Sequence, residues 1–485
     1  MSSSCHGQPT RQRDEPRTRP LTRRQSGDVG GIRHTGAVSV RSTTQGGLGL
    51  AQGTALYIAA VLGTGVLVLP ALAADAAGPG AILAVAILAA ISVPLAATFA
   101  ALSRRHPDAG GVATFARRAF GPATARVISY WFFFGTPIGA PVAALMTAQY
   151  VVAITGGDRM RVVLIAAVLI VVPLMVAVFG VRFTGWVQLI LSGALVAVLL
   201  FVLVAAVPHA DPANLTPFLP HGLTGVGGAI SLYIWAFAGW EAVAGIAGEF
   251  RNPHRDIPRA TALALVIVSV AYLAIQSMTI LTLGQDAGSS QVPLLSIVTH
   301  SLGRGWGVIV AAIAAIVVAG VFNAYIAAFS KLGAAMGRDG DLPRWFGRGA
   351  ARGGVARRGL ALSTVVMAIY FAIVAGVGEL APVILIHTSI AAAIYGVGVA
   401  SALVLLPRWS VGWWMAVLSC ALVLGLLVLA GANLVYPAVM ALAAVLVGVI
   451  VRGRRGRERA GAGDGAGVHD AGVDCAGDEV ARDAV

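Results

Sequence analysis

Twelve apolar stretches, each long enough to cross a lipid bilayer, constrain this chain more than any other feature. About 20 consecutive apolar residues span the hydrocarbon core as one helix. The 485 residues are 58% hydrophobic and only 11% charged, whereas about 25% of residues are charged in a soluble protein. The composition therefore predicts an all-α membrane protein with 12 transmembrane helices. The stretches lie near residues 48–72, 79–101, 126–153, 162–181, 183–207, 224–249, 260–284, 305–329, 359–378, 380–406, 411–430 and 433–451.

The placement of basic residues predicts the orientation of these helices. The net charge is +13. With a cytoplasmic N-terminus, only Arg159, Arg161 and Arg304 of the 34 Lys and Arg residues fall in outer loops. This asymmetry follows the positive-inside rule and predicts a multi-pass protein of the cell membrane (a bacterial inner or plasma membrane) with both termini cytoplasmic. Because the charge is spread over loops rather than gathered on one face, we expect a lipid bilayer as partner and no nucleic acid.

Several classes of function lack their signatures. Cys5, Cys420 and Cys475 have neither the spacing of metal ligands nor an expected outer location, so we expect no metal site and no disulfide. No phosphate-cradling loop occurs, and no nucleophile–base pair lies in the apolar stretches. We therefore expect no enzyme, no catalytic residue and no cofactor. The polar stretches 1–45 and 453–485 are predicted to be disordered cytoplasmic tails.

Two apolar stretches are interrupted by small residues. In the first, "VLGTGVLVLP" contains Gly63, Thr64 and Gly65; in the sixth, "WAFAGWEAV" (235–243) adds a carboxylate, Glu241. Glycine is also common where membrane helices pack closely, and a single interruption would favour that explanation. Interruptions at corresponding positions of two repeats are instead typical of a transporter's binding site.

The spacing of the interruptions predicts the domain organisation. Each interrupted stretch is the first of a group of five, and because five is odd the second group is inserted upside down relative to the first. We expect two inverted five-helix repeats and two further helices, over residues 46–210, 211–408 and 409–452.

A broken helix at the centre of a membrane exposes backbone groups that need partners. Freed N–H groups at the start of a half-helix carry partial positive charge and suit a carboxylate. Freed carbonyls suit an ammonium group or a cation. A pair of such breaks can recognise both ends of a zwitterion, as in an amino acid.

The same segments resemble a known family. "GTGVLVLP", "PDAGGVATFARRAFG", "WAFAGWEAV", "EFRNPHRDIPRA" and "FSKLGAAMGRDGDLPRWF" resemble motifs of the amino acid–polyamine–organocation superfamily of permeases, in order from about residue 48 to 346. "TPIGAPVAAL" and the first stretch are most similar to the branch that exports methionine and branched-chain amino acids. The resemblance implies a LeuT-like 5+5 inverted repeat plus two C-terminal helices, with alternating access to a central site.

The resemblance also implies roles for the residues at the interruptions. Amides at the first would bind the substrate carboxylate, and carbonyls at the sixth would bind its ammonium group. By position, the amides belong to Gly63, Thr64 and Gly65, and the carbonyls to Ala236, Phe237 and Ala238.

Three larger side chains complete the predicted site. Trp235 falls where the family has an aromatic lid, although it could be ordinary aromatic filler. Glu241 is expected in gating or proton coupling, with a structural carboxylate as the alternative. His387, in the tenth stretch, could relay protons or be a hydrogen-bonded core histidine. Ser192 and Ser330 could face the pathway or bond between helices.

The charge inventory limits the substrate. An acidic substrate would need a buried Arg or Lys, and a cationic one needs more carboxylates than Glu241. We expect a secondary active transporter of neutral, mostly apolar amino acids (methionine, leucine, isoleucine, valine), with a proton or other ion as coupling partner. The resemblance favours proton-coupled export; the alternatives are an importer or exchanger, or a permease for polyamines or other organic cations.

Overall fold

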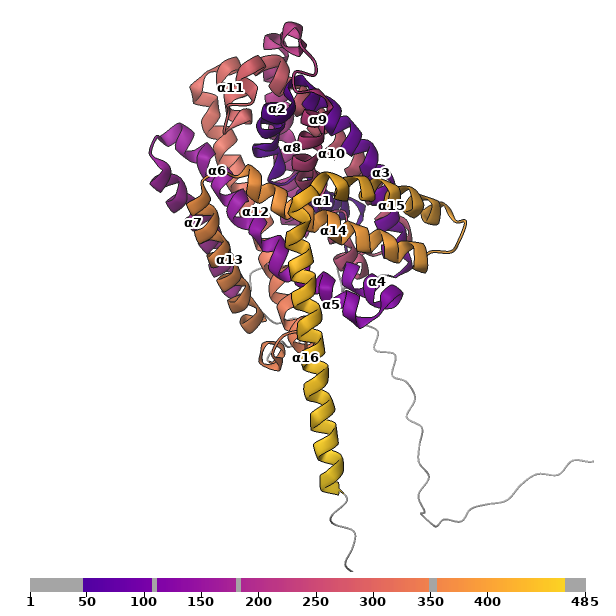
Figure 1. Ribbon diagram of the computed structural model, residues 1–485. Coiled ribbons are helices and arrows are strands. Elements are labelled where there is room, and N and C mark those ends of the chain that lie inside the picture. Colours follow the sequence, from indigo (N-terminus) through magenta and orange to yellow (C-terminus); the bar gives the residue numbers. More distant parts are fainter. Residues whose placement is uncertain (1–46, 107–110, 180–184, 349–355, 467–485) are drawn as a thin grey trace, which may run out of the picture. The chain divides into compact units, whose positions relative to one another are not determined.

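A computed structural model describes residues 47–106, 111–179, 185–348 and 356–466. The expected tail 1–45, the end of the second tail (467–485) and part of the "PDAGG" motif lie outside these residues. Within them the chain is helical apart from one isolated bridge between Leu48 and Phe250. The α-helices are α1 (Leu50–Val61), α2 (Leu69–Ala77), α3 (Ala81–Arg105), α4 (Gly111–Phe120), α5 (Pro122–Tyr130), α6 (Gly139–Thr155), α7 (Arg159–Val178), α8 (Gly185–Ala206), α9 (Gly222–Phe237), α10 (Pro253–Leu283), α11 (Pro293–Leu302), α12 (Gly307–Asp339), α13 (Arg357–Val377), α14 (Ala381–Leu405), α15 (Val411–Ala430) and α16 (Val435–Ala466) (Figure 1).

Nine helical segments in the described part of the chain are long and apolar enough to cross a membrane. Three further apolar helices, α1, α9 and α11, are shorter. Many large apolar side chains on these segments are exposed, such as Val168, Val204 and Val270. Such an outward apolar surface is what a helix bundle presents to lipid tails.

The first apolar stretch is broken where its small residues lie. α1 ends at Val61 and α2 begins at Leu69, with a short turn, η1 (Gly65–Leu67), between them. Pro70 occupies the first turn of α2, where its missing N–H has no helical partner to lose. The sequence therefore interrupts the helix and restarts it within one stretch.

The sixth stretch is broken in the same way. α9 ends at Phe237, and a 3-10 segment, η7 (Ala242–Glu249), follows. Between them Gly239 has a φ of 134°, which side chains with a Cβ rarely adopt. A Cβ at this position would also lie 3.1 Å from the backbone of Ala60. Glycine here allows α1 and the broken sixth stretch to approach each other.

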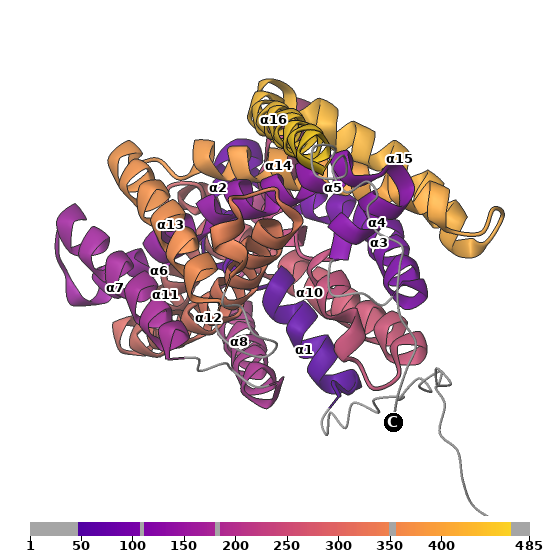
Figure 2. The same ribbon diagram turned by 90° about the horizontal axis from the view of Figure 1, so that it is seen from below.

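The remaining helices pack around these two breaks. α1 lies against α10 and α8, as the view in Figure 2 shows for α10. α9 packs on α2 and α3, while α12 packs on α6, α7 and α13. One large cluster of buried apolar side chains joins these helices. The breaks are thus enclosed by protein rather than lipid.

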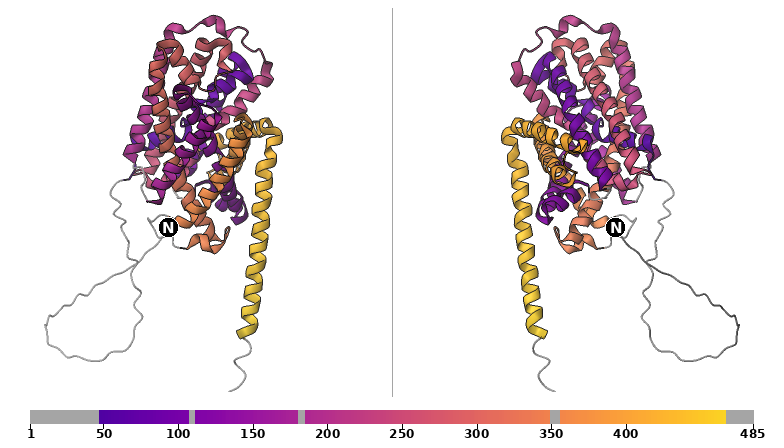
Figure 3. Two further views of the ribbon diagram at one scale, coloured as in Figure 1. Left: turned by 90° about the vertical axis from the view of Figure 1, so that its left-hand side faces the viewer. Right: turned by 90° about the vertical axis from the view of Figure 1, so that its right-hand side faces the viewer.

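The C-terminal helix corrects one expected boundary. We predicted a disordered tail from residue 453, but α16 continues to Ala466, and Figure 3 shows it running past the other helices. The segment "RGRRGRERA" contains five Arg, which favour helix, and two Gly, which do not. An existing helix extends into such residues at little cost because nucleation has already occurred.

Candidate functional site

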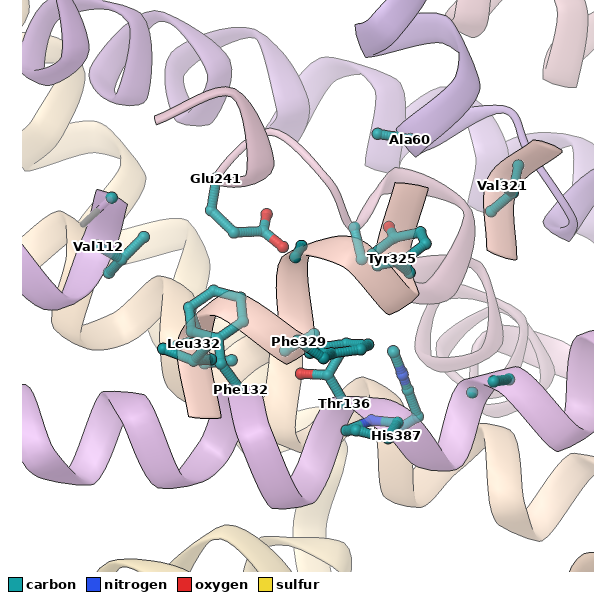
Figure 4. Close-up of a pocket in the computed structure, with 18 of the residues that line it drawn as sticks. Ala60, Val112, Phe132, Thr136, Glu241, Val321, Tyr325, Phe329, Leu332 and His387 are labelled. Atoms are coloured by element: carbon teal, nitrogen blue, oxygen red, sulfur yellow. The ribbon is translucent and has the colours of Figure 1, made fainter. Parts of the chain in front are cut away.

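A cavity of about 290 Å³ lies between the two broken stretches. Its walls come from the end of α1, the start of α4, the α5–α6 segment, the break after α9, and α12 and α14. Figure 4 shows Glu241 on one side and Thr136 with His387 on another, with Tyr325 and Phe329 of α12 between them. Most of the lining is apolar or aromatic, which suits an uncharged organic group.

The predicted site residues gather at this cavity. Thr64, Trp235, Ala238, Glu241 and His387 all line it. The other predicted residues adjoin them along the chain without lining the cavity themselves; they are Gly63, Gly65, Ala236 and Phe237. Residues from positions 64 to 387 are therefore brought together at one place.

At the first break, side chains from other helices bond several carbonyls, while four consecutive amides are left unbonded in the described part of the chain. Tyr272 donates its hydroxyl to the Leu62 carbonyl at 3.0 Å, and Tyr150 donates to the Leu67 carbonyl at 2.6 Å. Gln276 donates to the Pro70 carbonyl at 3.2 Å. The amides of residues 63–66 have no acceptor among the described residues. Unpaired N–H groups of this kind suit an anion.

At the break in the sixth stretch, side chains bond an amide, that of Gly239. Gly239 donates its amide to Glu241 Oε2 and to the Tyr395 hydroxyl, each at 3.0 Å. The same hydroxyl donates to the Phe237 carbonyl at 3.2 Å. The carbonyls of Ala236 and Ala238 accept no hydrogen bond from the described residues. Free carbonyls are suited to a cation or an ammonium group.

Glu241 has a structural contact as well as a place at the cavity. Its carboxylate accepts the Gly239 amide two residues earlier, which stabilises the turn after α9. The side chain also lines the cavity and lies near Tyr325, as Figure 4 shows. The structural alternative for Glu241 thus has a geometric basis, and both contacts can coexist.

Trp235 and His387 form one wall. Their ring centroids are 4.5 Å apart. Gly139 of α6 lies against both, because a Cβ there would be 3.1 Å from the Trp235 ring and 3.5 Å from the His387 ring. Neither ring nitrogen of His387 has a hydrogen-bond partner among the described residues. The expected alternative of a hydrogen-bonded core histidine therefore does not describe His387 here.

Sequence reasoning missed the aromatic residues of the cavity. Phe132, Tyr325 and Phe329 line it, but an apolar span gives no signal for which aromatic side chains face lipid and which face a cavity. Two polar candidates instead bond between segments: Ser192 donates to the Ala55 carbonyl and Ser330 to the Ala356 carbonyl.

Together, the broken helices, free backbone groups and central cavity define a membrane transport protein rather than an enzyme. The chain belongs to the amino acid permease family, whose sequence model matches residues 48–451. It is therefore a multi-pass membrane protein.

Individual relatives agree with this family. The chain is 29% identical over 399 residues to the uncharacterized amino acid permease YecA of Bacillus subtilis (strain 168), covering 81% of this chain and 93% of YecA. It is 33% identical to the L-methionine/branched-chain amino acid exporter YjeH of Escherichia coli (strain K12), covering 59% of this chain and 68% of YjeH. Its fold is similar to that of MhsT, solved in complex with L-phenylalanine, with a TM-score of 0.55 at 12% identity over 80% of this chain and 100% of MhsT.

Proposed function

We propose that this permease is a secondary active transporter of neutral, mostly apolar amino acids that works by alternating access. The observation that carries the proposal is the complementary pair of unpaired backbone groups beside one cavity. Amides of residues 63–66 would bind the substrate carboxylate, and the carbonyls of Ala236 and Ala238 would bind its ammonium group. The Phe237 carbonyl already accepts the Tyr395 hydroxyl, which leaves it one lone pair for a ligand.

The architecture we propose has 12 spans, with inverted repeats over residues 46–210 and 211–408. Of the nine long apolar segments, Val411–Val451 contains both α15 and α16, which separate at Gly431 with a φ of 52°. The broken stretches, α1 with α2 and α9 with η7, supply the other two spans. α2 is counted together with α3 in the segment Leu69–Arg105. α1, α9 and η7 are each shorter than the about 20 residues that a spanning helix needs.

The proposed substrate class follows from the cavity walls. Among the described side chains that line the cavity, Glu241 is the one acidic residue and none is Lys or Arg. It already bonds the Gly239 amide, so a second positive charge on the substrate would lack a dedicated partner. Methionine, leucine, isoleucine and valine fit this environment, and YjeH by name exports methionine and branched-chain amino acids.

Direction and coupling are parts of the same proposal. Both termini would lie in the cytoplasm of a bacterial cell. Exchange of a proton for the amino acid would drive net export of the amino acid. Glu241 and His387, the titratable Glu and His side chains at the cavity, would bind the coupling proton, and Trp235 would act as the lid. Import, or exchange without a proton, would use the same site.

Counterflow in proteoliposomes tests this function. Vesicles loaded with unlabelled leucine should accumulate labelled leucine, and methionine, isoleucine and valine should compete while arginine, putrescine and glutamate should not. An imposed pH gradient should drive net uptake in the wild type. Absence of exchange with every neutral amino acid would reject the proposal, and competition by putrescine would favour an organic-cation permease.

A matched pair of variants separates the two contacts of Glu241. Glu241→Gln keeps an oxygen that can accept the Gly239 amide, so counterflow should persist while the response to a pH gradient is lost. Glu241→Ala removes both functions and should abolish counterflow. An unchanged pH response in Glu241→Gln would remove this residue from proton coupling.

A further inference from the structure

We propose that the cavity recognises the sulfur atom of methionine, through His387 and the aromatic rings around it. The inference rests on the proposed function and narrows its substrate class. It predicts that methionine binds more tightly than norleucine, which has the same chain length with a methylene group in place of sulfur.

The walls of the cavity are rich in aromatic side chains. Phe132, Trp235, Phe322, Tyr325 and Phe329 all line the cavity. Tyr325 and Phe329 are stacked with centroids 5.9 Å apart, and Figure 4 shows Phe329 between Phe132 and Thr136. A thioether sulfur near an aromatic ring gains about two- to tenfold in affinity over a hydrocarbon contact.

His387 contributes an imidazole whose hydrogen-bonding groups are unsatisfied. Both ring nitrogens are buried and lack a hydrogen-bond partner among the described residues, although the residue contributes to the cavity wall. A buried polar group without a partner is costly to a protein. A half-turn of the imidazole exchanges its ring carbons and nitrogens, so we infer that one of the two ring orientations offers an N–H group to a ligand in the cavity. A thioether accepts such a hydrogen bond weakly, and a hydrocarbon cannot.

The wall formed by Trp235 and His387 lies next to the break in the sixth stretch. Trp235 lies three residues before Ala238, one helical turn from the proposed ammonium site, and its ring contacts His387. Gly139 keeps α6 close behind both rings. A substrate whose charged ends lie at the two breaks would therefore direct its side chain toward Trp235 and His387.

Inhibition of labelled leucine counterflow by methionine and by norleucine tests the inference with the full-length protein in proteoliposomes. The wild type should have an inhibition constant about fivefold lower for methionine than for norleucine. In His387→Leu the two constants should differ by less than twofold, because methionine loses affinity more than norleucine does. The control Ile394→Val changes an apolar residue of the same helix and cavity, and should leave the ratio unchanged.

The outcomes separate this inference from the function on which it rests. Equal inhibition by the two ligands in the wild type would overturn it while leucine counterflow still supports the proposed function. An unchanged methionine preference in His387→Leu would also overturn it. If no neutral amino acid is exchanged, both the function and the inference fail. The wild-type ratio needs no variant, so it is informative even if His387→Leu does not fold.

Discussion

Gly239 occupies the tightest point between the two broken stretches. Its φ of 134° is accessible to glycine but strained for other residues, and a Cβ would press against the Ala60 backbone at 3.1 Å. Its amide also bonds both Glu241 and Tyr395. We expect Gly239→Ala to cost about 1–3 kcal/mol of backbone strain and to reduce leucine counterflow at least tenfold.

Gly228, on α9 before this break, provides the control. A Cβ there would meet only Ala76 Cβ, at an ordinary 3.8 Å, so Gly228→Ala should transport like the wild type. Counterflow rates and melting temperatures of the two variants, measured side by side, check this difference. Equal rates for Gly239→Ala and the wild type would mean that the close approach at Gly239 is dispensable.

For single residues, the sequence predicts where a helix breaks better than it predicts which side chains contact the break. Gly63 and Gly65 signal an interruption because glycine weakens helices wherever it occurs. The bond between Glu241 and Gly239 is also local. Tyr395, in contrast, is 156 residues from Gly239, and no local pattern connects them. The contact between Trp235 and His387 depends on tertiary packing in the same way.

Among the elements, α6, η1 and α11 meet at one hydroxyl group. Tyr150 of α6 donates to the Leu67 carbonyl at 2.6 Å and accepts the Leu294 amide at 3.2 Å. All three residues are buried, and neither Leu67 nor Leu294 lines the cavity. The hydroxyl therefore joins α6, the first break and α11, and we expect these two bonds to break when the cavity opens on the α11 side.

Tyr150→Phe should shift the protein toward a state open on the α11 side. The loss of about 1 kcal/mol of hydrogen bonding corresponds to about a fivefold change in population. A Thr64→Cys reporter, with Cys5, Cys420 and Cys475 replaced by serine, should then react faster with a membrane-impermeant thiol reagent added outside.

Tyr272→Phe is the matched control for Tyr150→Phe. Tyr272 also donates to a carbonyl of the first break, that of Leu62, but it belongs to α10 and forms no hydrogen bond with α11 among those described. Tyr272→Phe should lower the stability of the protein without increasing the labelling rate of the Thr64→Cys reporter. Equal labelling of the wild type and Tyr150→Phe would contradict the gating role of Tyr150.

The C-terminal end of α12 is attached to α4 and α5 by two ion pairs of different burial. Arg126 and Asp341 are 2.5 Å apart with side chains only 11% and 7% exposed, whereas Arg117 and Asp339 are 48% and 45% exposed. Asp341→Asn should lower the free energy of unfolding by about 3 kcal/mol because a buried charge loses its partner. Asp339→Asn should lower it by less than about 1 kcal/mol.

Reversible unfolding of both variants in detergent measures this difference. Equal stabilities would show that burial does not set the strength of these pairs. The sequence places Asp339 and Asp341 in one motif, "GRDGDLP", and gives no means of distinguishing them. Their different burial arises only when α5 packs against the end of α12.

Across the whole molecule, the two breaks differ in which backbone groups are bonded by side chains of other helices. Side chains from α6 and α10 bond the carbonyls of the first break and leave its amides free, while Glu241 and Tyr395 bond the Gly239 amide of the other and leave carbonyls free. The sequence predicted both breaks, but not this division of partners, because Tyr150, Tyr272 and Tyr395 lie on other helices. The cavity walls contributed by α12 were likewise unpredictable, since aromatic residues in apolar spans are alike in sequence whichever way they face.

If this site binds both charged ends of an amino acid, a ligand that lacks either end should bind poorly. Labelled leucine counterflow would be measured against leucine, against 3-methylbutylamine, which lacks the carboxylate, and against 4-methylpentanoate, which lacks the ammonium group. We predict that leucine competes with labelled leucine and that neither analogue does so at a hundredfold excess. Competition by the amine as strong as that by leucine would contradict this prediction and would identify a permease for organic cations.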